Sequence, residues 1–366
     1  MRIVNISHVS FPGEKDPMQW IKKSRFFKGI WEAVAEREEV IFIDFINYDG
    51  RVNNNGINYW FQKKSQHALQ FPLRVHLSIA KTKPDVVIVH GIQFSLQLIL
   101  LRIILNKKCK IVAQDHGGRI IQHPLKKILQ KLVDRCVDIY FFTSQAQAKT
   151  WQNAGMINDI SKVCEVIEIS SVFQPEPREI ALSITGIAKE NTYIWVGHLN
   201  ANKDPLLVVK AFTQFIESGT NAHLYMIFQS EELLPEIQNW LQLNKHAIEY
   251  IHLEGKIDHA DLRHWFCSAE FIISSSHYEA GGVSVCEGMS CGCIPILSNI
   301  PSFISMTEEE CGIVYETGSI QSLLLALYAS SRMNVSEERK KTLVRYEKAL
   351  SFQAIASRIR EVLHSL

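Results

Sequence analysis

The chain has 366 residues, of which 46% are hydrophobic and 21% charged, and its formal net charge is +1. This composition is ordinary for a globular protein and excludes a disordered, fibrous or repeat protein. The length suits two α/β domains better than one compact core. Residues 1–180 hold 25 Lys/Arg and 17 Asp/Glu, which gives them a net charge of +8. The remaining residues hold 14 Lys/Arg and 21 Asp/Glu, which gives them a net charge of −7. This charge asymmetry has two possible explanations. The basic part contacts an anionic membrane surface or a phosphate-linked acceptor, or the two parts attract each other across a cleft.

The beginning of the chain reads as a first strand rather than as a signal peptide, because residues 1–13 contain no long apolar stretch and no small-residue cleavage site. The most apolar segment, Ile92–Leu105, is too short for a membrane span and contains Arg102. Eight cysteines are present without a C-x-x-C pair, which favours reduced, hydrophobic cysteines over zinc ligands or disulfides. We therefore expect a cytoplasmic chain.

Short β-branched or aromatic runs alternate with amphipathic segments in the first half, which predicts a parallel sheet with helices on both faces. The expected strands are Ile3–Ser7, Val40–Phe45, Asp85–His90, Cys109–Gln114, Ile139–Thr143 and Val163–Glu168. The expected helices are Trp20–Arg37, Ser65–Lys81, Phe94–Asn106, Pro124–Arg135 and Ser144–Ala154.

A break follows at residues 170–190, where Pro175, Pro177 and Gly186 interrupt any periodicity and predict a linker. The alternation then restarts. The expected strands are Tyr193–Val196, His223–Phe228, Ile248–Leu253, Glu270–Ser274 and Ile294–Ser298, and the expected helices are Pro205–Glu217, Glu231–Leu243, Asp258–Cys267 and a helix from about Gly282 to Cys291.

The pattern predicts two Rossmann-like, doubly wound α/β domains. We expect one domain at 1–175, a second at 190–345, and a C-terminal helix at 346–366 for which packing back on the first domain is one arrangement. Ligands of such sheets bind beyond the carboxyl ends of the strands.

The most informative segment follows the strand that ends at Ser274. Gly281 and Gly282 open a helix there, and the free N–H groups and dipole of a helix start favour a phosphate. Glu279 precedes the glycines, and Glu287 lies roughly 6–8 Å further along the helix axis at ~1.5 Å per residue. This spacing suits a nucleotide sugar, with one carboxylate for sugar hydroxyls and the other for the ribose diol. The alternative to a binding site is that Glu279 is an ordinary surface carboxylate and that Glu287 caps a helix or forms a salt bridge.

The segment resembles the GT-B retaining glycosyltransferases of family 4 (glycosyl transferases group 1), whose C-terminal domain carries an E-x(7)-E motif. Glu279 and Glu287 have that spacing. Ile194–Pro205, Ser298–Phe303 and Cys311–Tyr315 are also similar to the family. The resemblance is specific from about residue 192 to 330 and thin over the first half. It implies a GT-B fold, in which two Rossmann-like domains face a central cleft, with an acceptor-binding domain at 1–175 and a nucleotide-sugar-binding domain at 190–345.

The resemblance also implies site residues. Glu279, Lys203 and His116 are the expected catalytic residues: Lys203 binds the donor diphosphate, and His116 faces the donor sugar from a loop with two glycines. His198 stands where the family has an arginine, and a histidine is only partly charged near neutral pH. The expected donor-binding residues are Glu287, His198, Gly197, Gly281, Gly282, Val283, Gly255 and Lys256, the last two meeting the nucleobase through their backbone.

The implied activity is transfer of a hexose-type sugar from a nucleoside-diphosphate sugar to a glycan or lipid-linked acceptor in cell-surface polysaccharide synthesis, with retained anomeric configuration. We expect no cofactor and no nucleic-acid partner, and the chain has no D-x-D sequence that would call for a metal. A nucleotide-sugar epimerase on the same scaffold and an inactive sugar-nucleotide-binding subunit remain alternatives. A nicotinamide-dependent oxidoreductase is disfavoured, because no G-x-G-x-x-G follows an expected strand.

One basic, amphipathic segment raises the question of a membrane. Its apolar positions are Leu125, Ile128, Leu129, Leu132 and Val133, interleaved with Lys126, Lys127, Lys131 and Arg135. The pattern is typical of a helix packed on the core, or of a peripheral contact with the inner face of a membrane.

Overall fold

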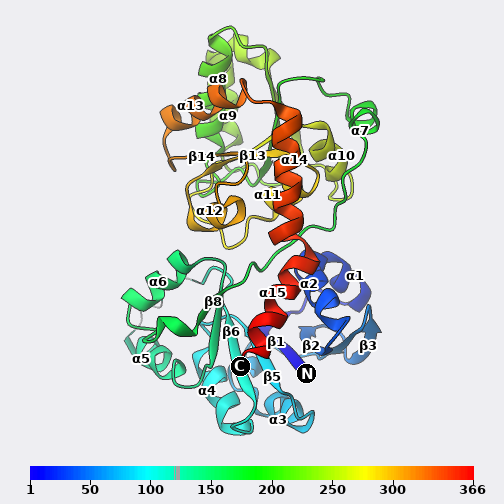
Figure 1. Cartoon of the computed structure of the whole chain (residues 1–366), viewed down its shortest axis with the longest axis vertical. Coiled ribbons are helices and arrows are strands. Elements are labelled where there is room, and N and C mark those ends of the chain that lie inside the picture. Colours follow the sequence, from blue (N-terminus) through cyan, green and yellow to red (C-terminus); the bar gives the residue numbers. More distant parts are fainter. Residues whose placement is uncertain (119, 121–123) are drawn as a thin grey trace. The chain divides into compact units, whose positions relative to one another are not determined.

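The computed structural model describes residues 1–118, 120 and 124–366, without the side chains of residues 124–126. The described chain divides into two compact units, which are residues 1–168 with 352–366, and residues 169–351. Each unit has its own sheet of mainly parallel strands with helices around it, which confirms the predicted α/β class (Figure 1).

The first unit is built on an eight-stranded sheet in the order β3-β4-β2-β1-β5-β6-β7-β8. Its strands are β1 (Arg2–Phe11), β2 (Glu39–Ile46), β3 (Gly50–Asn54), β4 (Ile57–Phe61), β5 (Val86–His90), β6 (Lys110–Gln114), β7 (Ile139–Phe142) and β8 (Val163–Glu165). Its helices are α1 (Pro17–Lys23), α2 (Arg25–Ala35), α3 (Leu73–Lys81), α4 (Ser95–Ile104), α5 (Pro124–Val133), α6 (Gln145–Asn153) and α15 (Phe352–His364), with 3₁₀ turns at Ala68–Gln70 and Ile160–Lys162. Every residue of β5 is buried, as expected for a central parallel strand covered on both faces.

Two features of the first unit differ from the expectation. The sequence analysis missed the hairpin β3–β4, whose turn residues Asn55 and Gly56 have φ values of +47° and +80°. An Asn-Gly pair between alternating residues is a strong signal for such a turn. The helix expected over Trp20–Arg37 is broken at Ser24, whose hydroxyl donates to the carbonyl of Trp20 (2.6 Å).

The second unit is built on a six-stranded, fully parallel sheet in the order β11-β10-β9-β12-β13-β14. Its strands are β9 (Thr192–Gly197), β10 (His223–Phe228), β11 (Ile251–Gly255), β12 (Phe271–Ser274), β13 (Ile294–Ser298) and β14 (Ile313–Tyr315). Its helices are α7 (Arg178–Thr185), α8 (Pro205–Glu217), α9 (Leu234–Leu243), α10 (Leu262–Ser268), α11 (Val283–Ser290), α12 (Pro301–Thr307), α13 (Ile320–Ser330) and α14 (Val335–Arg345), with a 3₁₀ turn at Lys245–Glu249 and a π-helical turn at Tyr346–Leu350.

The segment expected as a linker is partly helical. α7 forms within it and packs on α10, where Arg178 donates to the carbonyl of Ser268 (2.9 Å) and the hydroxyls of Thr185 and Ser268 are 2.9 Å apart. The first unit accordingly ends at residue 168 and the second begins at residue 169. The sequence analysis placed the end of the first domain at 175 and the start of the second at 190.

The end of the chain returns to the first unit. α15 packs on α2, where the Phe352 ring lies so close to Gly29 that a Cβ on this glycine would be 2.6 Å from it (Figure 1). Residues 346–351, expected as part of the same C-terminal helix, remain in the second unit.

Both sheets reverse their strand order next to a central strand. In the second unit the reversal lies between β9 and β12, and in the first between β1 and β5. The loops that leave the carboxyl ends of such strands separate to opposite faces of the sheet and leave a crevice, which is where open α/β sheets bind ligands.

Candidate active site

Two loops of the second unit, one after β9 and one after β12, are joined by hydrogen bonds at the strand-order reversal. The hydroxyl of Ser275 donates to the backbone carbonyl of Lys203 (2.6 Å). The backbone N–H of His277 donates to the carbonyl of Asn202 (2.8 Å), whose side-chain amide donates to the carbonyl of Tyr278 (3.0 Å). The two loops therefore form one layer over the carboxyl ends of β9 and β12.

An ion pair between Lys203 and Glu279 links the side chains of these loops. The ammonium of Lys203 contacts Oε1 of Glu279, and the two side chains are only 22% and 14% exposed. A pair that is largely shielded from water is less screened than a surface pair. The structure thus brings together two of the three residues expected to be catalytic, and each holds the other in place.

The start of α11 lies directly after this pair. Its N-cap, Gly282, has φ +70°, and a Cβ there would lie 2.6 Å from the Phe303 ring. A Cβ on Gly281 would similarly lie 2.6 Å from Ile169, so close packing requires glycine at both positions. Among the described residues, α11 has no side-chain cap and no acid in its first turn, which begins at the half-buried Val283. Its first N–H groups and positive dipole end are therefore available to an anion.

Glu287 lies inside α11 and is only 3% exposed. Its Oε1 is 2.6 Å from Nε2 of His259, a residue that the sequence analysis missed. The hydrogen bond to Glu287 raises the pKa of His259 above its usual value, although burial opposes this rise. The signal that could have found His259 is its position, four residues after Gly255 in a loop that leaves a parallel strand.

The remaining expected donor residues lie at the same edge of the sheet. Gly197 ends β9, where a Cβ would be 3.1 Å from the Trp195 ring, and the exposed His198 follows it. Gly255 ends β11 with φ +70° and precedes the exposed Lys256. The donor-binding candidates therefore lie in or after the loops that leave the carboxyl ends of β11, β9 and β12, three strands of one parallel sheet.

The third expected catalytic residue, His116, lies in the first unit in a hydrogen-bonded chain. Its Nδ1 pairs with Oε2 of Glu168, and its Nε2 is 3.1 Å from Nδ1 of His90. Nε2 of His90 is in turn 3.0 Å from Oδ1 of Asn5. Both ring nitrogens of His116 are thus engaged inside the unit, which the sequence analysis did not foresee.

The protonation of this chain follows from its surroundings. Burial alone would lower the pKa of His116, but the Glu168 carboxylate outweighs it and the net shift is upward. Burial lowers the pKa of His90 well below its usual value, so this ring is neutral. A neutral His90 that donates to Asn5 through Nε2 accepts through Nδ1, and this arrangement has room for a proton on each ring nitrogen of His116.

The apolar stripe on α5 is divided between core and surface. Val133 is fully buried, whereas Ile128 and Leu132 are 58% and 43% exposed. The side chains of Leu125 and Lys126 lie outside the described residues.

In the described part of the chain, no helix combines the length and apolarity that a membrane crossing needs. Nor do three or more His, Cys, Asp or Glu side chains of the described residues gather as metal ligands would. Metal independence stays a prediction.

Comparison with known proteins points to one family. Residues 178–342 match the family model described as Glycosyl transferases group 1. The chain is 22% identical over 315 residues to the GDP-mannose:cellobiosyl-diphosphopolyprenol alpha-mannosyltransferase of Xanthomonas oryzae pv. oryzae, covering 81% of this chain and 80% of the relative.

Solved structures share the whole fold. Anabaena Alr3699/HepE in complex with UDP has a TM-score of 0.74 at 13% identity and is matched over 100% of both chains. The sucrose-phosphate synthase of Thermosynechococcus elongatus has a TM-score of 0.71 at 15% identity, over 100% of this chain and 98% of that one. The second unit thus contains a region similar to the glycosyl transferases group 1, and the solved structures show that the whole chain has the GT-B fold.

Proposed function

We propose that the chain transfers a hexose-type sugar from a nucleoside-diphosphate sugar to a glycan or lipid-linked acceptor, with retention of anomeric configuration, in cell-surface polysaccharide synthesis. The printed name of the Xanthomonas relative, with a GDP-mannose donor and a cellobiosyl-diphosphopolyprenol acceptor, supports a lipid-linked acceptor. HepE was solved with UDP, which supports a nucleoside-diphosphate donor.

The observation that carries the proposal is the Lys203–Glu279 pair beside the uncapped start of α11. A lysine ammonium and the first N–H groups of a helix are the groups that stabilise a diphosphate. The neighbouring carboxylate can accept hydrogen bonds from sugar hydroxyls, and the buried Glu287 can accept them from a ribose diol. The cationic groups thus match the diphosphate, and the two carboxylates match the hydroxyls of the sugar and of the ribose.

The chemistry we propose needs no covalent intermediate on the protein. The bond between the anomeric carbon and the diphosphate oxygen breaks, and the acceptor hydroxyl oxygen bonds to that carbon on the same face. The hydroxyl proton passes to the departing diphosphate oxygen. Negative charge grows on the diphosphate as this bond breaks, so Lys203 and the start of α11 stabilise the transition state more than the bound donor. His198, where the family has arginine, adds only partial charge near neutral pH.

His116 contributes as a cation in this proposal. Its two N–H groups are held by Glu168 and His90, so the ring is fixed in direction and cannot act as a general base while it stays doubly protonated. A fixed imidazolium would place positive charge just after the carboxyl end of β6.

A thermal-shift panel of nucleoside diphosphates and nucleotide sugars tests the proposal directly. We expect one base and one sugar to raise the melting temperature selectively, since a ligand that binds only the folded state stabilises it. Product analysis by NMR should then show the donor's anomeric configuration kept in a new glycosidic bond. Conversion of the donor without any acceptor would instead indicate an epimerase, and binding without turnover or donor hydrolysis an inactive subunit.

Two substitutions test the charged pair. Lys203→Ala and Glu279→Ala should each lower kcat by about 10²–10³-fold, because the first removes a cation aimed at the charge that grows on the diphosphate and the second removes the carboxylate that positions the donor sugar. Circular dichroism and melting temperature should remain close to those of the wild type. Lys245→Ala, an exposed lysine of the same unit, is the matched control. Unchanged turnover in either variant would remove that residue from the mechanism.

A pH titration tests the charge on His116. Because Glu168 raises its pKa, Glu168→Gln should move the histidine titration, followed by ¹H–¹⁵N NMR, to lower pH. Because the pKa of His116 is higher in the folded state than in the unfolded state, protonation of His116 stabilises the fold. This stabilisation is fully present at pH values below the pKa of the unfolded state, near 6.5, and is lost as the pH rises through the pKa of the folded state. The stability difference between wild type and Glu168→Gln should therefore shrink at alkaline pH. Glu361→Gln, on the exposed face of α15, should change neither result; a His116 titration unmoved by Glu168→Gln would contradict the assignment.

We also propose that α5 makes a peripheral contact with an anionic membrane surface. Ile128 and Leu132 are exposed one turn apart, and the exposed Lys131 lies between them in sequence. Exposed apolar side chains beside a basic residue suit the boundary between acyl chains and anionic headgroups.

Sedimentation with phosphatidylglycerol vesicles tests this contact. At low salt the wild type should pellet with the vesicles, and the double variant Ile128→Ser, Leu132→Ser should bind at least tenfold more weakly, since each apolar side chain contributes about 1.5–3 kcal/mol when buried. Leu325→Ser, at an exposed position of α13, is the matched control. Failure of the wild type to pellet at low salt would exclude the contact.

A further inference from the structure

The imidazole of His259 lies in the turn between β11 and α10 and donates a hydrogen bond to Glu287. The backbone of this turn is held, because the N–H groups of Asp261 and Leu262 donate to the carbonyl of Asp258 (2.9 and 3.2 Å). The side chain of His259 is 59% exposed, but its Nε2 reaches the buried carboxylate of Glu287 on α11 at 2.6 Å. A carboxylate accepts hydrogen bonds and does not donate them, so Nε2 carries the proton of this bond.

An aromatic ring holds the imidazole on a second side. The ring centre of Phe173 is 4.9 Å from that of His259, and the two ring planes are tilted by 32°. Phe173 is itself tied to α11, because its backbone N–H and the hydroxyl of Ser290 both donate to the hydroxyl oxygen of Ser171 (2.9 and 2.8 Å). The imidazole therefore contacts both a carboxylate of α11 and a ring fixed to the same helix, which leaves it few side-chain rotamers.

The contact with His259 also supports the charge of Glu287. Among the described residues, His259 is the ion-pair partner of this carboxylate. A buried carboxylate without a partner is costly, whereas one that accepts a hydrogen bond from an imidazole keeps both its charge and its direction. An ionised carboxylate has about four lone-pair sites, and the bond to Nε2 uses one of them, on Oε1. The bond therefore fixes the carboxylate and leaves Oε2 to a ligand.

We propose that His259 is a positioning residue for the ribose of the donor nucleotide. It holds Oε1 of Glu287 so that the carboxylate accepts hydrogen bonds from both hydroxyls of the ribose diol. The site then selects a ribonucleoside diphosphate over its 2′-deoxy form, because the deoxy form lacks one donor and leaves a charged acceptor unpaired. This inference rests on the proposed transferase function and adds to it the residue that sets the preference for the sugar of the nucleotide.

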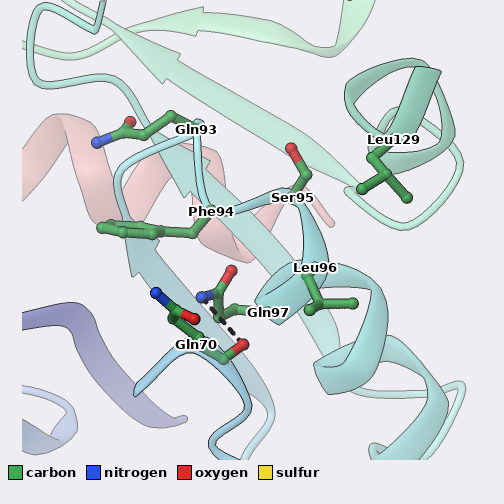
Figure 2. A pocket seen from close by; sticks show the side chains of 7 residues that line it. All are labelled: Gln70, Gln93, Phe94, Ser95, Leu96, Gln97 and Leu129. Carbon is green, nitrogen blue, oxygen red and sulfur yellow. Dashed lines mark hydrogen bonds between the residues drawn. The ribbon is translucent and has the colours of Figure 1, made fainter. Parts of the chain in front are cut away.

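A pocket of the first unit is a competing place for hydroxyl groups (Figure 2). Its volume is about 490 Å³, and its lining includes the carboxamides of Gln70, Gln93 and Gln97. Gln97 donates through Nε2 to the carbonyl of Leu69 (3.0 Å), and its side-chain oxygen can accept from a hydroxyl. The seven described residues that line the pocket include no carboxylate. Nucleotide binding in this pocket would respond to a change at Gln97 and not to one at His259.

Isothermal titration calorimetry on the full chain tests the role of His259. The probes are UDP and GDP, each compared with its 2′-deoxy form. For at least one base the wild type should bind the ribonucleotide about tenfold more tightly, since the deoxy form loses a hydrogen bond to a charged group. His259→Ala should remove most of this preference, and His259→Gln, whose amide nitrogen can donate at a similar reach, should restore it. His246→Ala, at an exposed histidine of the same unit that pairs with Glu217, is the matched control.

Several results would overturn the inference. They are a wild type that does not distinguish the two forms, a His259→Ala variant that keeps the preference, and a preference lost equally in His259→Ala and His259→Gln. Loss of the preference in Gln97→Ala but not in His259→Ala would place the nucleotide in the pocket of the first unit instead.

Kinetics separate this inference from the proposed function. With a nucleotide-sugar donor, His259→Ala should raise the donor KM about tenfold and change kcat by about twofold at most, because the ribose is bound equally in the ground state and the transition state. His259→Gln should return the donor KM towards that of the wild type. If the wild type transfers sugar and His259→Ala keeps its donor KM, only the assignment of His259 fails. If the ribonucleotide preference depends on His259 but no sugar is transferred to any acceptor, the proposed function fails and the nucleotide-positioning role stands.

Discussion

The candidate site of the second unit depends on hydrogen bonds between two loops, which leave the sheet on either side of a strand-order reversal. Ser275 and Asn202 bond across these loops through backbone carbonyls, and the Lys203–Glu279 pair joins them through side chains. The backbone bonds fix where the two charges lie, and the pair keeps each charge from being buried alone. A lysine held in this way is already positioned, so the diphosphate binding that we propose would cost less ordering entropy.

Much of this site could be predicted because its signals are local. A buried strand, two glycines and a helix follow one another within twenty residues, and the local sequence of each indicates its conformation. Gly282 adopts the positive φ that such a turn requires, and the spacing of Glu279 and Glu287 follows from helix geometry. The hairpin β3–β4 was also locally encoded, by Asn55–Gly56, and was missed only because its strands are short.

Contacts between distant parts of the chain could not be predicted in this way. His259 is 28 residues from Glu287, and His90 and His116 are 26 residues apart, so no periodicity or spacing rule relates them. Only the packed sheet order brings β5 beside β6 and sets their loops together. These contacts nevertheless determine which histidines are charged, because a carboxylate at hydrogen-bond distance outweighs the burial that would otherwise discharge the ring.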